Sequence, residues 1–369
     1  MKFDIDEKEE KKIKKRNEDK QKLNLILIFF FVLGFLVLVL VLVLSSNNKK
    51  KQQTPIETPT PITSTQPIRP VENKTLTVYN EESAERPIAV MIDNAIGDAL
   101  HAGLQESYLN YEILVEGGLT RIMAIYKDKD VPLIGPVRSS RNYFLDYMLE
   151  SDAIFVHYGW SPNAEEDEKS LNINNINGLY DQEVFRRDSK AIAPHNVFTK
   201  MAYIKSFLDK TTYNTYSDNY QLLNYSVDRI DLERDTGYVA KEANEIVIPY
   251  SSTDVRTYKY DSTNEFYLRG QNGKAQLDRR TNRQLHYKNI IIQRVDYEVI
   301  DNEGRLSVKT VGSGKGYIIT NGHFLPMTWS KQSRTAKTVY TYEDGSEVMV
   351  NDGNTFIQIV PTNSNISIS

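Results

Sequence analysis

Residues 86–94 read RPIAVMIDN, an apolar run that follows a proline and ends in an acid and an amide. This pattern is typical of a buried β-strand that carries polar groups to one edge of a sheet. Two further β-rich runs follow at 111–116 (YEILVE) and 119–126 (LTRIMAIY). The dipeptide Gly117-Gly118 between them allows the positive φ of a tight turn. The sequence therefore predicts a strand followed by a β-hairpin.

Helical and extended patterns alternate in the next part of the chain. Residues 139–149 predict a helix that a serine caps, and residues 153–158 (AIFVHY) predict a strand. Residues 161–171 and 199–208 predict two more helices. The fold class that we expect for residues 76–209 is therefore α+β or α/β.

From about residue 238 the pattern changes to short alternating strands separated by turn signals, which predicts a mainly-β domain at 238–369. The polar stretch 210–237 is the expected connection between the two domains. The segment GSGKG at 312–316 lacks the spacing of a P-loop, and we expect a hairpin turn there. The strands are expected at 245–250, 255–260, 265–269, 289–299, 305–311, 316–320, 338–342 and 347–350.

The N-terminal part predicts a membrane anchor. Residues 25–44 read LILIFFFVLGFLVLVLVLVL, a run long enough for the roughly 30 Å apolar core of a bilayer. Lysine and arginine are concentrated before this run, so the positive-inside rule places the N-terminus in the cytoplasm. We expect a cytoplasmic tail at 1–22, a transmembrane helix at 23–44, a Pro/Thr/Ser-rich linker at 45–75 and extracytoplasmic domains. A cleaved signal peptide is the alternative, but the run is long and lacks a small-x-small site.

Composition excludes several kinds of chemistry. The chain of 369 residues has no cysteine, which excludes disulfides, thiolate metal sites and a lipid-modified cysteine. Its 5 histidines show no metal-ligand spacing, so neither a metal nor a cofactor is expected. A formal net charge of -4 gives no basic field for nucleic acid.

The segment IGPVRSSR at 134–141 is the strongest candidate for a binding site. Its Gly-Pro turn leads into the expected helix start at Ser139, and Arg138 and Arg141 flank that start. Unpaired N–H groups of a helix N-terminus and two guanidinium groups suit a phosphate, sulfate or carboxylate. With Arg121, they form a predicted anion site.

Acid and base candidates are Asp93, Glu116, His157 and His195. Asp93 and His157 each end an apolar strand, where catalytic groups of α/β folds are common. Glu112 shares the parity of Glu116 on the expected strand, so both should project from one face. The alternative for the arginines is that they pair with these two glutamates and have a structural role only.

Several motifs together resemble the YerB-type lipoproteins of Gram-positive bacteria, a two-domain family of unknown function. The matching stretches of the first domain are RPIAVMIDN (86–94), EILVEGGLTRIMAIY (112–126), IGPVRSSR (134–141), FVHYGWS (155–161) and APHNVFT (193–199). Those of the second are FYLRG (266–270), LHYKNIIIQ (285–293), NGHFLPMTWSK (321–331) and DGNTFIQIVP (352–361). The resemblance implies an envelope-facing protein but no known reaction. Two departures are the missing lipid-modified cysteine and Gln276, where relatives often have a histidine.

These observations lead to two main hypotheses; a third, a cytoplasmic-facing interaction domain with reversed topology, is disfavoured by the distribution of basic residues around the apolar run. The first is a non-enzymatic, membrane-anchored envelope protein that binds an anionic wall polymer or a partner protein through the region of Arg138 and Arg141. The second is a cell-wall hydrolase or transferase that acts on phosphorylated glycan or polyprenyl-linked substrates. In that case the arginines neutralise phosphate, and Asp93, Glu116 or His157 moves the proton.

Overall fold

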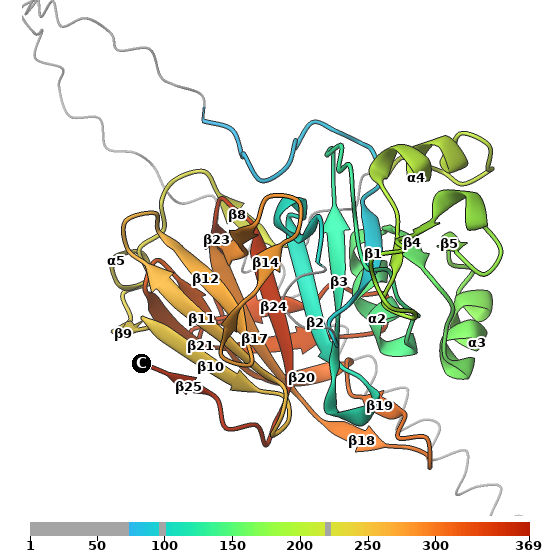
Figure 1. Ribbon diagram of the computed structural model, residues 1–369. Coiled ribbons are helices and arrows are strands. Elements are labelled where there is room, and N and C mark those ends of the chain that lie inside the picture. The colour runs from blue at the N-terminus through green and yellow to red at the C-terminus, as the bar shows by residue number, and fades with distance from the viewer. Residues whose placement is uncertain (1–73, 96–100, 218–222) are drawn as a thin grey trace, which may run out of the picture. The chain divides into compact units, whose positions relative to one another are not determined.

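The computed structural model of the chain describes residues 74–95, 101–217 and 223–369 (Figure 1). The predicted cytoplasmic tail and transmembrane helix lie outside these described residues, as does all but the last two residues of the predicted linker. Within the described residues, no helix is both long and apolar enough to span a bilayer. The described residues all belong to one compact unit.

This unit is built on a mixed 11-stranded sheet to which both predicted domains contribute. Its path runs β22-β21-β20-β17-β24-β2-β3-β1-β4-β5, and the short strand β9 pairs with β21. The strands span, in that order, Val339–Thr341, His323–Lys331, Gly312–Thr320, Asn289–Val295, Thr355–Pro361, Leu109–Leu114, Thr120–Tyr126, Ile88–Asp93, Ile154–His157, Asn175–Asn177 and, for β9, Lys241–Glu242.

Strand β24 joins the two halves of this sheet, and it is absent from the strands expected from sequence. It lies between β2 of the first half and β17 of the second and runs parallel to both. Ile357 of β24 is the register partner of Tyr111 on one side and of Ile291 on the other. The predicted domain boundaries stay a prediction. Strands of the N-terminal and the C-terminal segment are hydrogen-bonded to each other in one continuous sheet.

A second sheet, of six strands, comes entirely from the C-terminal segment. Its path runs β13-β12-β11-β10-β25, and β16 pairs with β12. Tyr258 and Tyr267 of this sheet pack in one buried core with Ile290, Ile292 and Phe356 of the central sheet. The strands β10, β11, β12, β13, β16 and β25 span Glu245–Pro249, Val255–Asp261, Phe266–Gln271, Lys274–Ala275, His286–Tyr287 and Ser367–Ile368.

Both faces of the central sheet are buried along β1. Met91 points into a core that α2 (Asn142–Met148) completes, whereas Ile92 points into the opposite core, which α4 (Met201–Leu208) lines. Figure 1 shows these helices and α3 (Pro162–Ser170) around β1, β4 and β5. Burial on both faces explains why β1 is apolar at consecutive positions.

Short elements complete the described part of the fold. Two-stranded pairs are β6 (Arg186–Arg187) with β7 (Val197–Phe198), β8 (Asn224–Ser226) with β23 (Met349–Asn351), β14 (Leu277–Asp278) with β15 (Arg283–Gln284), and β18 (Tyr297–Val299) with β19 (Leu306–Val308). Further helical turns are α5 (Leu232–Thr236), η1 (Leu104–Glu106), η2 (Glu116–Gly118), η3 (Leu149–Ser151) and η4 (Gln182–Val184).

The predicted mixture of helices and strands in the first segment and the mainly-β character of the second are confirmed. Strands β2 and β3 form the predicted antiparallel hairpin, and Gly117 and Gly118 in its turn have φ of 72° and 71°. The predicted helix at 161–171 is α3, whose first turn is capped by the Ser161 hydroxyl, which accepts from the amide of Ala164.

Two local predictions are wrong. Helix α2 begins at Asn142, and no side chain caps it, because the Ser139 hydroxyl donates instead to the carbonyl of Tyr158 at 2.9 Å. The segment at 312–316 is the first half of β20 and pairs with β21, so it is not a turn. Alternating glycines conceal a strand in the sequence, since they carry no side chain that could show the two-residue period.

A buried carboxylate, Glu112 on β2, connects the central sheet to the second sheet. Its Oε1 accepts from Nε of Arg256 at 2.5 Å, and its Oε2 accepts from Nη2 of Arg269 at 2.8 Å. The three side chains are 0% exposed. Arg256 also forms a bidentate pair with Asp254, at 2.6 and 2.8 Å. A buried charge without an ionic partner is costly in free energy. These ion pairs therefore hold β2 of the central sheet against β11 and β12 of the second sheet.

Neutral donors complete the surroundings of Glu112. Its oxygens also accept from the amides of Asn94 at 2.7 Å and Gln358 at 2.9 Å, and from the Thr120 hydroxyl at 2.7 Å. Burial raises the pKa of Glu112, but the two arginines and the bonds from Thr120 and Gln358 together lower it to about 2. Glu112 is therefore ionised at neutral pH.

Replacing Arg256 by Met should lower the free energy of unfolding by about 3–5 kcal/mol, because Asp254 loses its buried partner and Glu112 keeps only one arginine. Urea unfolding followed by circular dichroism measures this. The matched control is Arg283→Met on β15, an exposed arginine, which should change the free energy by less than about 0.5 kcal/mol. Equal effects of the two substitutions would contradict the importance of the buried pair.

The stability of the protein should also depend on pH through Glu112. Its folded pKa lies below the ordinary value of 4.5, so its contribution is complete above about pH 4.5 and is lost as the pH falls toward about 2. Glu112→Gln should be less stable at pH 7 but should lose less free energy of unfolding between pH 5 and pH 2. Urea unfolding at several pH values tests this, and parallel pH profiles for the two proteins would refute it.

Candidate functional site

Three segments that are distant in sequence meet at the C-terminal end of β1. The segment around Arg138 runs beside β1, since the amide of Asp93 donates to the carbonyl of Pro136 at 2.8 Å and the amide of Arg138 donates to the carbonyl of Met91 at 2.9 Å. The loop before β7 brings His195 to the same place. Asp93, at the end of the strand, is only 1% exposed.

Asp93 holds two of the predicted site residues directly. Its Oδ2 accepts from Nδ1 of His195 at 2.6 Å and forms an ion pair with Nε of Arg138 at 3.0 Å. Its Oδ1 accepts from the amide of Ala95 at 3.0 Å. The His195 and Arg138 side chains are 31% and 23% exposed, so each reaches solvent beside a buried carboxylate. The bond at Nδ1 leaves Nε2 of His195 as the ring nitrogen that can meet a ligand.

A second pair lies next to this group. Arg141 donates from Nε and Nη2 to the two oxygens of Glu116, at 2.6 and 2.8 Å, in a bidentate ion pair. Arg121 is the register partner of Asp93 across β1 and β3, and its Nη1 donates to the carbonyl of Ser139 at 2.5 Å. The structural alternative for Arg141, pairing with Glu116, is therefore observed.

Arg121 is the least satisfied charge of this region. It is 7% exposed, and burial lowers its pKa to about 10, together with the repulsion of Arg141 and Arg138. Among the described residues, no carboxylate forms an ion pair with it within 4.0 Å. Arg121, Arg138 and Arg141, named here the arginine cluster, thus face only two carboxylates, Asp93 and Glu116.

The remaining candidate, His157, lies in the interior of the protein. His157 is 0% exposed, and its Nδ1 donates to the carbonyl of Gly159 at 2.8 Å, while Nε2 lies 3.3 Å from Asn175 Oδ1 and 3.4 Å from Glu168 Oε2. Burial lowers its pKa to about 4. This setting makes His157 a neutral imidazole of the interior that no ligand on the surface can reach.

Two expectations about the site need correction. Glu112 and Glu116 do not project from one face of a strand, because β2 ends at Leu114 and Glu116 lies in the turn η2. The expected helix N-terminus at Ser139 is absent, since α2 begins later and Ser139 contributes its carbonyl to Arg121. The helix start is thus shifted to Asn142, with Arg141 at the N-cap position.

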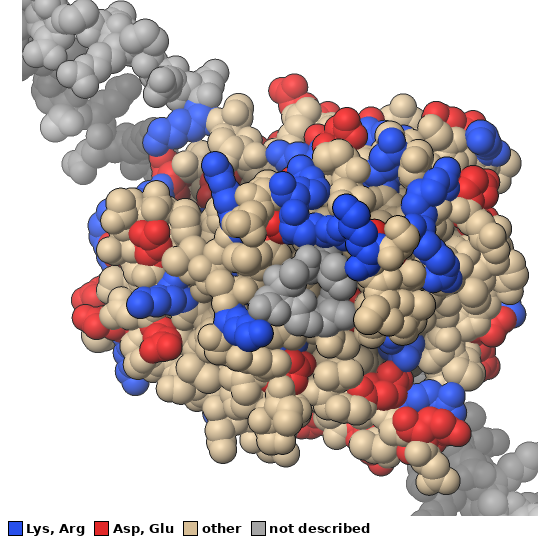
Figure 2. Space-filling model, in the orientation of Figure 1, with Lys and Arg blue, Asp and Glu red and all other residues tan. Residues whose placement is uncertain are grey.

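Two further basic residues near His195, Arg187 and Arg279, are not among the candidates predicted from the sequence. Arg187 donates to Asn196 Oδ1 at 2.9 Å in the β6–β7 hairpin, and Arg279 of the C-terminal segment pairs with Asp188 at 2.8 Å. Figure 2 shows Lys and Arg side chains gathered on one face of the molecule, over β1, β4 and α4.

Within the described residues, no group of three or more His, Cys, Asp or Glu side chains could hold a metal ion.

Comparisons with known proteins match this chain over both segments. Residues 75–214 match the family model described as "Protein of unknown function (DUF3048) N-terminal domain", and residues 246–357 match the C-terminal domain of the same family. The chain is 32% identical over 291 residues to a protein of Bacillus subtilis (strain 168) named "Putative lipoprotein YerB". That match covers 77% of this chain and 84% of the relative.

A crystal structure of the YerB protein from Bacillus subtilis has a similar fold, with a TM-score of 0.67 at 30% sequence identity. The match covers 77% of this chain and 94% of that chain. The resemblance to YerB-type proteins, inferred from the motifs, is thereby confirmed. The chain belongs to the family of proteins of unknown function DUF3048 and contains both its N-terminal and its C-terminal domain.

Proposed function

We propose that this protein is a membrane-anchored, extracytoplasmic binding module of the cell envelope whose arginine cluster holds an anionic ligand. The envelope location is supported by the name of the Bacillus subtilis relative, a lipoprotein, and by the apolar run at 25–44. In place of a lipid-modified cysteine, which this chain lacks, the apolar run serves as the anchor.

The observation that carries the binding proposal is the excess of positive charge in the arginine cluster. Three guanidinium groups lie together, whereas the ion pairs of this region use only Asp93 and Glu116. Arg121 is nearly buried, and the repulsion of its two neighbours contributes to its lowered pKa. An anion bound beside the exposed parts of Arg138 and Arg141 relieves this repulsion, which favours binding over the empty state.

One observation favours the enzyme hypothesis as a second candidate. Asp93 fixes His195 through a bond of 2.6 Å at Nδ1, and the ring is partly exposed. A carboxylate in this position orients an imidazole whose other nitrogen can accept a proton from a substrate or from water. The neighbouring arginine cluster supplies charge for a phosphate group.

Substituting both Arg138 and Arg141 by Ala should weaken the binding of inorganic phosphate to the full-length chain by at least about tenfold, because two charge-assisted contacts are lost. Isothermal titration calorimetry measures the affinity. The fold should persist with a loss of about 1–3 kcal/mol, since Asp93 keeps its bonds from His195 and Ala95. Lys259→Ala, an exposed cation on β11, is the control and should leave phosphate binding unchanged. Equal affinity of the double variant and the wild-type protein would reject the anion site.

His195 separates the two candidate functions. For a binding module, His195→Ala should change phosphate affinity by less than about threefold, because the arginines carry the charge. For an enzyme, the same substitution should abolish hydrolysis of a chromogenic phosphodiester while phosphate binding remains. Absence of hydrolysis by the wild-type protein, followed by absorbance of the released chromophore, would reject the enzyme candidate.

A further inference from the structure

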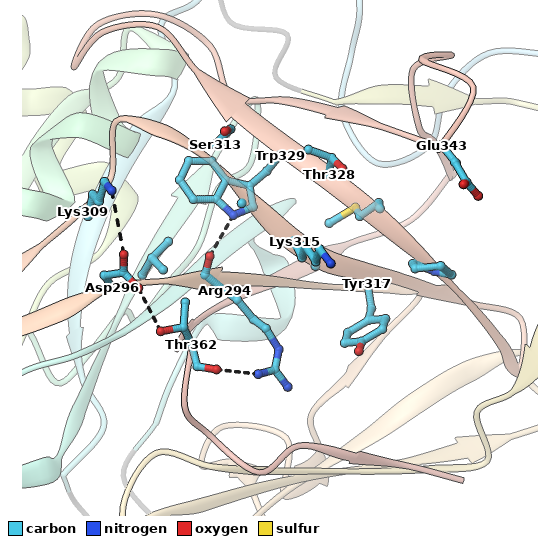
Figure 3. A pocket seen from close by; sticks show the side chains of 15 residues that line it. Arg294, Asp296, Lys309, Ser313, Lys315, Tyr317, Thr328, Trp329, Glu343 and Thr362 are labelled. Atoms are coloured by element: carbon cyan, nitrogen blue, oxygen red, sulfur yellow. Dashed lines mark hydrogen bonds and ion pairs between the residues drawn. The ribbon is translucent and has the colours of Figure 1, made fainter.

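A hollow of about 750 Å³ lies where β17, β20 and β21 reach beyond the second sheet, and it is independent of the arginine cluster (Figure 3). Residues that line it include Arg294 on β17, Lys315 and Tyr317 on β20, Pro326 and Thr328 on β21, and Thr362. Neither the sequence motifs nor the comparisons assign this place a role. Its volume is in the range of small-molecule and oligomer binding sites.

Strand register places these side chains on one face of the central sheet. Lys315 is opposite Thr328 and Tyr317 is opposite Pro326 in the β20–β21 pair, and Ile292 is opposite Tyr317 in the β17–β20 pair. Arg294 therefore has the parity of Ile292 and faces the same side. The core beneath the second sheet covers Ile292 but ends before Lys315, which is exposed.

Glycines at 314 and 316 give the hollow a rigid floor. A Cβ at Gly314 would lie 2.6 Å from Nε1 of Trp329, and one at Gly316 would lie 2.1 Å from the carbonyl oxygen of Ile292. Trp329 is 2% exposed, and its Nε1 donates to the carbonyl of Arg294 at 2.8 Å. The GSGKG segment thus allows Trp329 to pack closely against Gly314 on one face of the sheet, while Lys315 extends from the opposite face into the hollow.

A second hollow, of about 460 Å³, continues the first. The two share Tyr317, Pro326 and Glu343, and the second adds Tyr238 and Phe324. The rings of Tyr317 and Phe324 lie 5.7 Å apart at 80°. Together the two hollows form one elongated groove, called here the β20–β21 groove, with flat apolar side chains along its length.

Besides the pair of Lys309 and Asp296, the β20–β21 groove is lined by three cations, Arg294, Lys315 and Lys241, and by one carboxylate, Glu343, so positive charge is in excess. Among the described residues, no carboxylate pairs with Lys315 within 4.0 Å, and Arg294 uses Nη1 for the carbonyl of Thr362 at 2.8 Å. Lys309 lies 3.9 Å from Asp296, so that pair is already balanced. Ser313 and Thr328 also line the groove, and the Thr362 hydroxyl donates to Asp296 at 2.9 Å (Figure 3). The groove thus combines unpaired positive charge, hydroxyl groups and aromatic rings.

We propose that the β20–β21 groove binds an acidic carbohydrate chain. The C–H face of a sugar ring packs on Tyr317 and Pro326, because the face of an aromatic ring is negative and attracts such hydrogens. Sugar hydroxyls exchange hydrogen bonds with the Thr and Ser hydroxyls, and the anionic group of the sugar meets Lys315 and Arg294. An added peptide strand is disfavoured, since β17 and β20 are paired on both sides and β21 has only a short gap, at residues 325–327, between its second partner strands β9 and β22.

The test uses the full-length chain and oligogalacturonate, a carbohydrate with carboxylate groups and no phosphate. Calorimetry should show binding that weakens with salt and that is at least about tenfold tighter than binding of neutral dextran oligomers or of oligoglutamate. Lys315→Ala should weaken it at least about tenfold, Lys315→Arg should restore it, and Tyr317→Ala should weaken it without affecting the salt dependence. Lys315 is exposed and Tyr317 is half-buried, so urea unfolding of each variant is measured as well, and unchanged midpoints exclude misfolding.

Three results would overturn the proposal: no binding of oligogalacturonate, equal binding of oligoglutamate, or equal binding of dextran. No binding of oligogalacturonate would show that the groove does not bind an acidic carbohydrate. Equal binding of oligoglutamate would show a site for anions or peptides in general. Equal binding of neutral dextran would show that the cations do not contribute to binding. Arg138→Ala with Arg141→Ala is the matched control, and it should leave oligogalacturonate affinity unchanged. Loss of affinity in that control would transfer the binding to the arginine cluster and would likewise overturn the proposal.

Discussion

The carboxylate of Glu112 is the constraint on which the arrangement of the two segments depends. It is ionised in an environment without solvent, and two arginines from the second sheet, Arg256 and Arg269, neutralise it. The cost of leaving any of these charges unpaired excludes structures in which the second sheet moves away from β2. Gln358 on β24 donates to the same carboxylate, so the strand that joins the halves of the central sheet is tied to this centre as well.

The arginine cluster differs from this centre in its balance of charge. At Glu112 the buried arginines have carboxylate partners at 2.5 and 2.8 Å, and Asp254 adds a further negative charge. Around Arg121 the cations exceed the carboxylates, and the side chains of Arg138 and Arg141 remain partly exposed. Balanced charge stabilises a fold, whereas an accessible excess of one sign is the property expected of a binding site.

Local patterns predict much of the first segment correctly. The apolar run of β1 and the Gly-Gly turn between β2 and β3 depend on neighbours in sequence, so propensity and periodicity suffice for them. Asp93 and His195 are both predicted as candidates, but 102 positions separate them, and no local pattern shows that they share a hydrogen bond. The serine cap at Ser139 fails because a contact with Tyr158 outcompetes the local one.

The sequence alone establishes the apolar run at 25–44, the absence of cysteine, the strand-rich C-terminal segment and, through its motifs, the family. Only the tertiary structure decides that β24 lies between β2 and β17, because pairing partners are chosen by packing between segments distant in the chain. The same holds for the role of each charge. Glu112 and Glu116 cannot be distinguished by residue type or local pattern. In the structure, Glu112 is buried between two arginines of the core, whereas Glu116 remains partly exposed beside Arg141.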